Sequence, residues 1–153
     1  MIIYSTRRGS TEKIAIAIAR GMGEENIVNL KRKLPEELDD FIVIGSPIYY
    51  ERPLPEVLRF IEENNGLKDK VVAVFIVCMA DIFGVVGRRY AERKYLGLLK
   101  EKIKGDVIDE KIFRGWLINE NKKTIIDAQR WGEELALIFG RSKTVANDNK
   151  LGK

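Results

Sequence analysis

Residues 1–11 read MIIYSTRRGST, in which a short apolar run passes directly into a turn of hydroxyls, two arginines and one glycine. A helical pattern follows from Thr11 to Met22, where Ile14 and Ile18 share a face and glycines stand at the end. The alternation of isoleucine and alanine inside it would also suit a strand, but the alanine content and the Ser-Thr start favour a helix. An apolar strand, a polar turn and a helix in direct succession indicate an α/β fold built on a parallel sheet.

The rest of the chain repeats this alternation. Phe41–Ile44 and Val71–Val77 are nearly continuous apolar runs rich in β-branched residues, as expected of strands covered on both faces. Short connections between strands and helices predict an open parallel sheet with helices on both faces. The expected strands are Met1–Tyr4, Ile27–Leu30, Phe41–Ile44, Val71–Val77 and a segment within Val107–Ile118, and the expected helices are Thr11–Met22, Pro55–Glu63, Gly87–Lys104 and Asp127–Phe139.

Composition excludes several classes of function. The 153 residues include no histidine and a single cysteine, Cys78, which excludes histidine catalysis, an internal disulfide and most metal sites, so no metal is expected. Without a histidine to activate it, Cys78 is expected to be a core residue rather than a nucleophile. The net charge is +4, but residues 141–153 carry four basic side chains against one acidic, so residues 1–140 are almost neutral. A nucleic-acid-binding surface is therefore not expected.

The length fits one domain, which we expect at residues 1–140. Residues 141–153 lack periodicity and are expected to form a flexible tail. The longest apolar run, Val71–Ala80, is too short to cross a bilayer as a helix, so no transmembrane segment is expected. No leader-like segment precedes the first strand, and the expected location is the cytoplasm. The oligomeric state is left open by the sequence.

Three segments of unusual composition follow expected strands and should meet at one edge of the sheet, where ligands of parallel α/β proteins bind. The first is Tyr4–Thr11, whose hydroxyls and glycine at the start of a helix suit an anion such as phosphate, although an ordinary helix cap would use similar residues. It is neither a Walker loop nor a GxGxxG fingerprint.

The second segment is Gly45–Pro53, expected to be a tight loop after a strand. Its two tyrosines, Tyr49 and Tyr50, could stack on a planar ring, or could pack against the neighbouring helix. The third segment is Cys78–Gly87, whose two glycines and Phe83 suggest a loop that approaches a ligand with its backbone. Together the three segments predict a binding site for a phosphorylated planar molecule.

Two of these segments resemble the flavodoxin family: Tyr4-Ser5-Thr6-x-x-Gly9-Ser10-Thr11, and Ile44-Gly45-Ser46-Pro47-Ile48-Tyr49. The resemblance covers about residues 1–140 and implies a three-layer fold with a five-stranded parallel sheet in the order 2-1-3-4-5. It also implies a bound FMN and electron transfer. The implied phosphate site is Ser5, Thr6, Arg7, Gly9, Ser10 and Thr11, with Arg8 beside it, and the implied ring site is Ser46, Pro47, Ile48, Tyr49 and Tyr50 on one side and Met79, Ala80, Asp81, Phe83 and Gly84 on the other, with Tyr49 as the first choice for stacking.

Within that family the chain is similar to the flavodoxin-type protoporphyrinogen oxidase branch. The similarity lies in Ser5-Thr6-Arg7, in Tyr90-Ala91-x-x-Lys94-Tyr95-Leu96 and in Trp131. It implies an alternative function, an FMN-dependent dehydrogenase acting on an anionic tetrapyrrole in heme biosynthesis. The long basic insertion that this branch carries before the last helix is absent here.

The partner expected from these readings is a redox protein or a small anionic substrate. The stretch Gly87–Lys104 carries seven basic residues against two acidic ones, and it could dock an acidic partner or an anionic substrate. A solvated helix face whose charges pair with one another is the commoner outcome for such a stretch. A receiver-type signalling domain is disfavoured, because no clustered aspartates follow the first strand.

Overall fold

The computed structural model describes residues 1–152, apart from the side chains of Asp81 and of residues 141–147. Strands and helices alternate along the chain as the sequence predicts. The strands are β1 (Ile2–Tyr4), β2 (Ile27–Asn29), β3 (Phe41–Tyr49), β4 (Arg52–Pro53), β5 (Val71–Cys78) and β6 (Asp106–Arg114). The helices are α1 (Ser10–Met22), α2 (Pro55–Glu63), α3 (Gly84–Ala91), α4 (Gly97–Lys102) and α5 (Lys122–Leu151), with short 3₁₀ turns η1 (Asn65–Asp69) and η2 (Ala80–Phe83) and a π-helical turn η3 (Glu92–Leu96) between α3 and α4.

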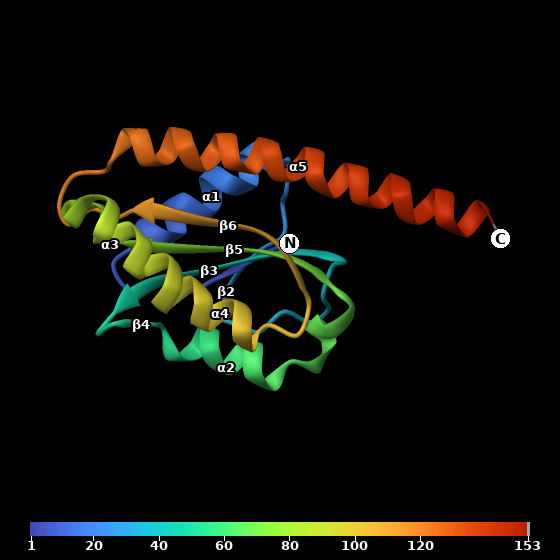
Figure 1. The fold of residues 1–153 in the computed structure, drawn as a ribbon, viewed down its shortest axis with the longest axis horizontal. Coiled ribbons are helices and arrows are strands. Elements are labelled where there is room, and N and C mark those ends of the chain that lie inside the picture. Colours follow the sequence, from blue (N-terminus) through green and yellow to red (C-terminus); the bar gives the residue numbers. More distant parts are fainter. Residues whose placement is uncertain (153) are drawn as a thin grey trace.

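Five strands form a parallel sheet in the order β2-β1-β3-β5-β6, which confirms the predicted topology. The short β4 is an addition that pairs antiparallel with β3. Helices α1 and α5 cover one face of the sheet, and α2 and the α3–η3–α4 run cover the other (Figure 1). The two nearly continuous apolar runs lie in β3 and β5, which are interior strands of this sheet and are covered on both faces.

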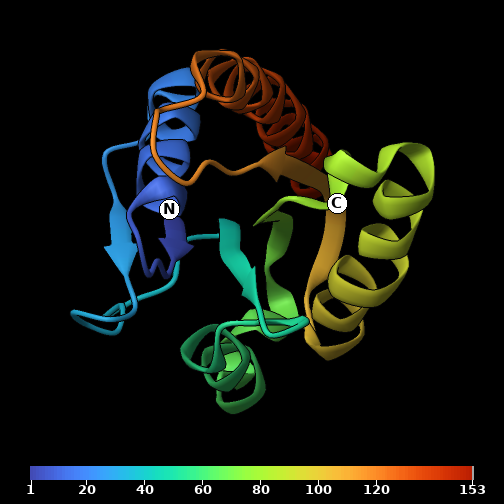
Figure 2. The same cartoon turned by 90° about the vertical axis from the view of Figure 1, so that its left-hand side faces the viewer.

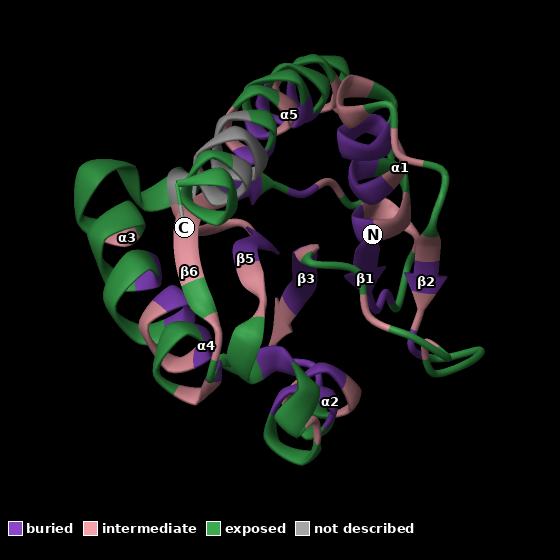
Figure 3. Cartoon of the chain, turned by 90° about the vertical axis from the view of Figure 1, so that its right-hand side faces the viewer, coloured by how far each residue is buried: buried purple, intermediate pink, exposed green. Residues whose placement is uncertain are grey.

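Alternate residues of each strand point to opposite faces and form two separate cores. On β1, Ile3 packs in the core under α2 and α4, whereas Ile2 and Tyr4 pack in the core under α1 and α5. Buried residues line both sides of the central strands in Figure 3. The central strand β5 is entirely apolar from Val72 to Val77, since both of its faces are covered.

The last strand, β6, lies within the expected segment Val107–Ile118 apart from Asp106, and it leaves residues 115–121 as a loop. Several boundaries differ from the sequence-based expectation. The expected helix Gly87–Lys104 begins at Gly84, is interrupted by η3 and ends at Lys102. The last helix was expected at Asp127–Phe139, but α5 begins at Lys122, where Asn121 caps it by accepting a hydrogen bond from Thr124 N–H at 3.2 Å. It continues to Leu151, past the end of the sheet (Figure 1). The flexibility of residues 141–153 stays a prediction.

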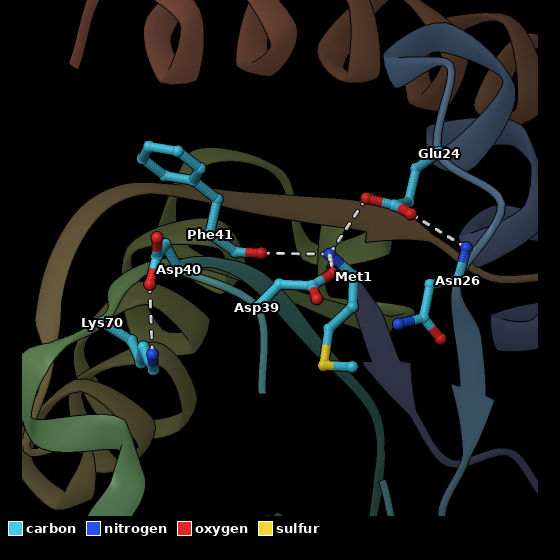
Figure 4. A network of polar contacts seen from close by, with 7 residues as sticks. All are labelled: Met1, Glu24, Asn26, Asp39, Asp40, Phe41 and Lys70. Carbon is cyan, nitrogen blue, oxygen red and sulfur yellow. Dashed lines mark hydrogen bonds and ion pairs between the residues drawn. The ribbon is translucent and has the colours of Figure 1, made fainter. Parts of the chain in front are cut away.

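The amino end of the sheet is tied by a charged network (Figure 4). The amino group of Met1 is buried and pairs with Glu24 at 3.0 Å and with Asp39 at 2.9 Å. It also donates to the carbonyl of Phe41 at 3.0 Å. Since buried charges are costly unless paired, these contacts satisfy the amino group and join β1 to β3. This network lies at the opposite end of the strands from the segments described next.

Candidate functional site

The three segments Tyr4–Thr11, Gly45–Pro53 and Cys78–Gly87 meet at the carboxyl edge of the sheet. Figure 2 looks at this edge, with α1 and α3 on either side of it. A cavity of about 790 Å³ lies there, within the size range of pockets for small ligands. Of the predicted site residues, those that line it are Arg8, Ser10, Pro47, Ile48, Tyr49, Tyr50, Met79, Ala80 and Phe83.

The loop after β1 is built to leave the first turn of α1 accessible to a ligand. Gly9 precedes the helix with φ +93°, a left-handed conformation that favours glycine, and a Cβ there would meet nothing within 4 Å. Thr6 is buried, and its hydroxyl accepts a hydrogen bond from Gly9 N–H at 3.0 Å, which fixes the loop. No side chain caps the amino end of α1. The N–H groups of this helix end are therefore available to an anion.

Thr11 is fully buried in the first turn of α1, and its hydroxyl finds no hydrogen-bond partner among the residues that the structure describes. An unpaired hydroxyl in such a position is costly. Ser5 is also buried, but its hydroxyl donates to Glu56 in the first turn of α2. Of the predicted phosphate residues, Thr11 thus has a free hydroxyl and Ser5 an occupied one.

The two arginines of the loop differ in position. Both are exposed, and Arg8 lines the cavity. Arg7 lies over the ring of Tyr49, with its guanidinium carbon 5.3 Å from the ring centre. This cation–π contact connects the loop after β1 to the segment after β3.

The segment Gly45–Pro53 is a β-hairpin formed by the end of β3 and by β4, so the expectation of a tight loop over these residues was wrong. Strand β3 continues through Ser46 and Pro47 to Tyr49, turns at Tyr50 and Glu51, and returns as β4. Tyr50 and Glu51 have φ of 51° and 64°, values typical of a two-residue hairpin turn that is usually made by glycine or asparagine. The turn was missed because neither residue signals it.

The base of the hairpin is fixed by Ser46. Its buried hydroxyl accepts a hydrogen bond from Leu54 N–H at 2.9 Å and donates to the carbonyl of Pro47 at 2.9 Å. The hydroxyl of Ser46, a predicted ligand residue, therefore makes its hydrogen bonds within the hairpin. Gly45 is required for packing, because a Cβ at this position would lie 2.0 Å from the ring of Phe75.

The segment after β5 is a short 3₁₀ turn that leads into α3. Met79 and Ala80 line the cavity, whereas Gly84, with φ +66°, does not belong to the lining. Phe83, also in the lining, is 77% exposed, and Ile82, Val85 and Val86 are exposed beside it. The predicted site residue Asp81 lies outside the described side chains.

A fourth segment, residues 115–117, also lines the cavity and was missed by the sequence reading. Gly115 donates its N–H to the carbonyl of Cys78 at 3.2 Å, which brings this loop against the end of β5. Trp116 is half-buried and Leu117 is exposed. A glycine and a tryptophan at the end of the segment expected to contain the last strand were the available signal.

The segment Tyr90–Leu96 and Trp131, quoted for the protoporphyrinogen oxidase resemblance, have contacts within the fold. Glu51 Oε2 accepts hydrogen bonds from Tyr90 Oη at 2.8 Å, Lys94 Nζ at 2.9 Å and Tyr95 Oη at 2.8 Å. The hydrogen bonds from Lys94 and the two tyrosines lower the pKa of Glu51 to about 2, and burial raises the pKa of Tyr95. Trp131 is buried and donates its indole N–H to Asp109 at 3.0 Å.

The basic stretch Gly87–Lys104 is largely neutralised by partners on other elements. Lys94 pairs with Glu51, Lys100 with Glu110 and Lys102 with Glu62, and Arg88 pairs with Glu92 on its own helix. This agrees with the commoner reading of a paired, solvated surface. Arg89 and Arg93 are exposed, and neither has an ion pair among the described residues.

The described residues contain no group of three or more acidic or cysteine side chains that could hold a metal ion. In residues 1–152, no helix combines the length and the apolar character needed to span a bilayer.

A flavodoxin domain family model matches residues 1–122. No curated protein shows significant similarity to the chain. Among solved structures, a flavodoxin from the domain Archaea is 19% identical with a TM-score of 0.63, covering 88% of this chain and 94% of that one. A flavodoxin, WrbA-like protein from Agrobacterium tumefaciens is 18% identical with a TM-score of 0.66, covering 90% and 94%. The rubredoxin oxygen:oxidoreductase of Desulfovibrio gigas is 16% identical with a TM-score of 0.68, covering 92% of this chain and 35% of that longer one. At identities this low, the structural similarity shows a shared fold and nothing more.

Proposed function

Since this chain belongs to the flavodoxin domain family of flavin-binding redox proteins, we propose that it binds FMN non-covalently and passes electrons between a reductase and an acceptor. FMN supplies, when bound, a ring system that accepts and releases electrons. The protein's part is to hold the phosphate, enclose the ring and control access to its edge. The observation that carries the proposal is Thr11: a buried hydroxyl with no partner among the described residues, in the helix turn that begins with the cavity residue Ser10.

The phosphate end of the site suits a dianion. The uncapped start of α1, a helix of 13 residues, offers N–H groups and the positive end of the helix dipole. The Thr11 hydroxyl would donate to a phosphate oxygen, which removes the cost of leaving it unpaired. Arg7 and Arg8 supply positive charge at the surface of the loop.

The ring end of the site suits a flat, mainly apolar molecule. The hairpin contributes Ile48 and Tyr49, and the opposite side contributes Met79. Tyr49 would stack on the ring, and Trp116 from the fourth segment offers a second aromatic surface in the same lining. These side chains would exclude water from the ring face.

FMN is favoured over FAD because the loop before α1 is short and offers one anion site at the helix end. The hydrogen bond between Thr6 and Gly9 fixes a short turn over the helix end, which suits a terminal phosphate. A dinucleotide would have to continue past this turn to a second binding surface. Riboflavin shares the ring but has no phosphate, so it serves as a control for the phosphate end.

Titration with quenching of flavin fluorescence as the signal tests the proposal. We expect FMN to bind most tightly, with riboflavin and FAD weaker by at least about tenfold, because charge-assisted hydrogen bonds to the phosphate are lost or strained. Equal affinity for riboflavin and FMN would contradict the phosphate site. Absence of quenching by any flavin would contradict the function itself.

The apolar surface beside the cavity consists of the exposed side chains of Ile82, Phe83, Val85 and Val86. It is the proposed docking surface for a redox partner in the cytoplasm. Phe83 and Val86 belong both to this exposed surface and to the cavity lining, so a partner there would meet the ring edge. Arg89 and Arg93, which have no ion pair among the described residues, flank it on the same helical run, and this favours an acidic partner or a small anionic acceptor.

The alternative function, oxidation of an anionic tetrapyrrole, draws on the large, mainly apolar cavity. The tyrosines and lysine quoted for that resemblance contact Glu51, which leaves them with a role inside this chain. Turnover of protoporphyrinogen by the FMN-loaded protein would establish this alternative, and its absence beside rapid reoxidation by small acceptors would favour the carrier.

A further inference from the structure

The tip of the hairpin is held in a conformation that its own residues disfavour. Tyr50 and Glu51 both have positive φ, although each carries a Cβ. Tyr50 is 89% exposed, so burial of its own side chain does not compensate for the strain. Such a conformation persists only when surrounding contacts determine it. The carboxylate of Glu51 provides those contacts.

Three donors from one helical run converge on a single oxygen of Glu51. Tyr90 and Tyr95 donate their hydroxyls at 2.8 Å, and Lys94 donates its ammonium group at 2.9 Å. Lys94 also donates to Tyr90 Oη at 2.9 Å, and the two tyrosine rings meet edge to face with centres 5.7 Å apart. We call Glu51 with these three residues the hairpin clasp.

The π-helical turn η3 makes this convergence possible. In an α-helix of 3.6 residues per turn, Tyr95 would lie about 140° around the axis from Tyr90. In η3 the N–H of Gly97 bonds to the carbonyl of Glu92, five residues back, which widens the turn. The widening turns Tyr95 towards the face that carries Tyr90 and Lys94. Wide turns of this kind are frequent at functional sites.

The clasp spans the cavity wall. Glu51, Tyr90 and Tyr95 all belong to the lining, and so do the neighbouring hairpin residues Tyr49 and Tyr50. The base of the hairpin is already fixed by Ser46, so the clasp determines where the tip lies. The clasp lowers the pKa of Glu51 from the ordinary 4.5 to about 2. The contribution of the Glu51 carboxylate to the stability of the hairpin is therefore complete at neutral pH and is lost only as the pH falls from about 4.5 towards 2.

We propose that the hairpin clasp fixes the hairpin as a rigid wall of the ring site, which makes Glu51 a positioning residue for the flavin ring. The inference rests on the proposed FMN function. If the wall is mobile, the binding-competent state is less populated, and the apparent affinity falls by the same factor for every ligand that uses the ring site. Loss of the clasp therefore weakens riboflavin and FMN equally, because the phosphate loop is untouched.

The test uses Glu51→Gln, Tyr95→Phe and the double variant, with Glu92→Gln as the matched control. Glu92 lies in η3 and pairs with Arg88 at 3.9 Å, outside the clasp. We expect Glu51→Gln to weaken FMN and riboflavin alike by about tenfold, and the double variant to be no weaker than Glu51→Gln alone, since both changes break one network. The control should match the wild type.

A second readout needs no flavin. In the apoprotein, chymotrypsin should cut after Tyr49 or Tyr50 several times faster in Glu51→Gln than in the wild type, as the tip is released. Unchanged cleavage and affinity would overturn the inference, and so would faster cleavage with unchanged affinity. A wild type that binds no flavin overturns the proposed function instead, and the cleavage rates then still show whether the clasp holds the hairpin.

Discussion

Thr11 and Thr124 show how one residue type serves two purposes in this molecule. Both are buried threonines in the first turns of helices that pack on the same face of the sheet. The hydroxyl of Thr124 donates to the carbonyl of Arg114 at 2.9 Å, whereas that of Thr11 has no partner among the described residues. A hydroxyl that stabilises the fold is expected at Thr124, and one kept for a ligand at Thr11.

Thr11→Val tests this difference, since valine keeps the shape and removes the hydroxyl. We expect the free energy of unfolding of the apoprotein to stay unchanged or rise by up to about 1 kcal/mol, because an unpaired buried group disappears. FMN affinity should fall by about tenfold or more, with riboflavin affinity unchanged. Thr124→Val, the control, should lower the unfolding free energy by about 1 kcal/mol. Urea denaturation and fluorescence titration measure both, and lower apoprotein stability in Thr11→Val would refute the assignment.

At the scale of elements, the position of α1 depends on its close approach to α5. A Cβ on Gly132 would lie 2.2 Å from the carbonyl oxygen of Ile18, and one on Gly21 would lie 2.0 Å from that of Gln129. Glycines at both positions thus let the two helix backbones touch. Since α1 begins in the proposed phosphate loop, this contact also sets where that loop lies.

Gly132→Ala should destabilise the protein although alanine is the better helix former. The added methyl group meets a backbone atom that cannot move away, so we expect a loss of about 2 kcal/mol or more in thermal or urea unfolding. Gly140→Ala in the same helix is the control, because a Cβ there meets nothing within 4 Å, and it should gain up to about 1 kcal/mol. Equal stability of the two variants would contradict the close approach.

At the scale of the whole molecule, charge is arranged so that little of it is free beside the cavity. The net charge is +4, and most of the basic residues of the α3–η3–α4 run are paired. Arg89 and Arg93 are exposed beside the apolar surface, and neither has an ion pair among the described residues. Electrostatic attraction of an acceptor should therefore depend on these two side chains.

Reoxidation of the reduced, FMN-loaded protein by ferricyanide checks this dependence. The rate constant should fall several-fold between about 0.01 M and 0.5 M salt, since salt screens charges beyond the Debye length. The double variant Arg89→Gln, Arg93→Gln should be slower at low salt and less sensitive to it. Arg20→Gln with Arg130→Gln removes the same charge from exposed positions on α1 and α5 and should behave as the wild type. Equal salt dependence of the two double variants would contradict the proposed docking surface.

Local signals in the sequence predicted the order of helices and strands along the chain and the loop before α1. The order of the strands in the sheet was predicted from the resemblance to the flavodoxin family. Glycine punctuation, β-branched runs and hydroxyls at a helix start act over a few residues, so they are readable in the chain itself. Gly9, with its positive φ, is of this kind. The continuous apolar run of β5 likewise predicted a strand that is covered on both faces, and β5 is an interior strand of the sheet.

Only the tertiary structure decided the hairpin at Tyr50 and Glu51, the aromatic contribution of Trp116 and the free hydroxyl of Thr11. Glu51 meets Tyr95 across 44 residues of sequence, and no local preference predicts a turn of tyrosine and glutamate with positive φ. Such contacts depend on the register of the sheet and on a wide helical turn, which bring distant side chains to one oxygen atom. Propensity acts between neighbours in sequence, whereas this site is made by neighbours in space.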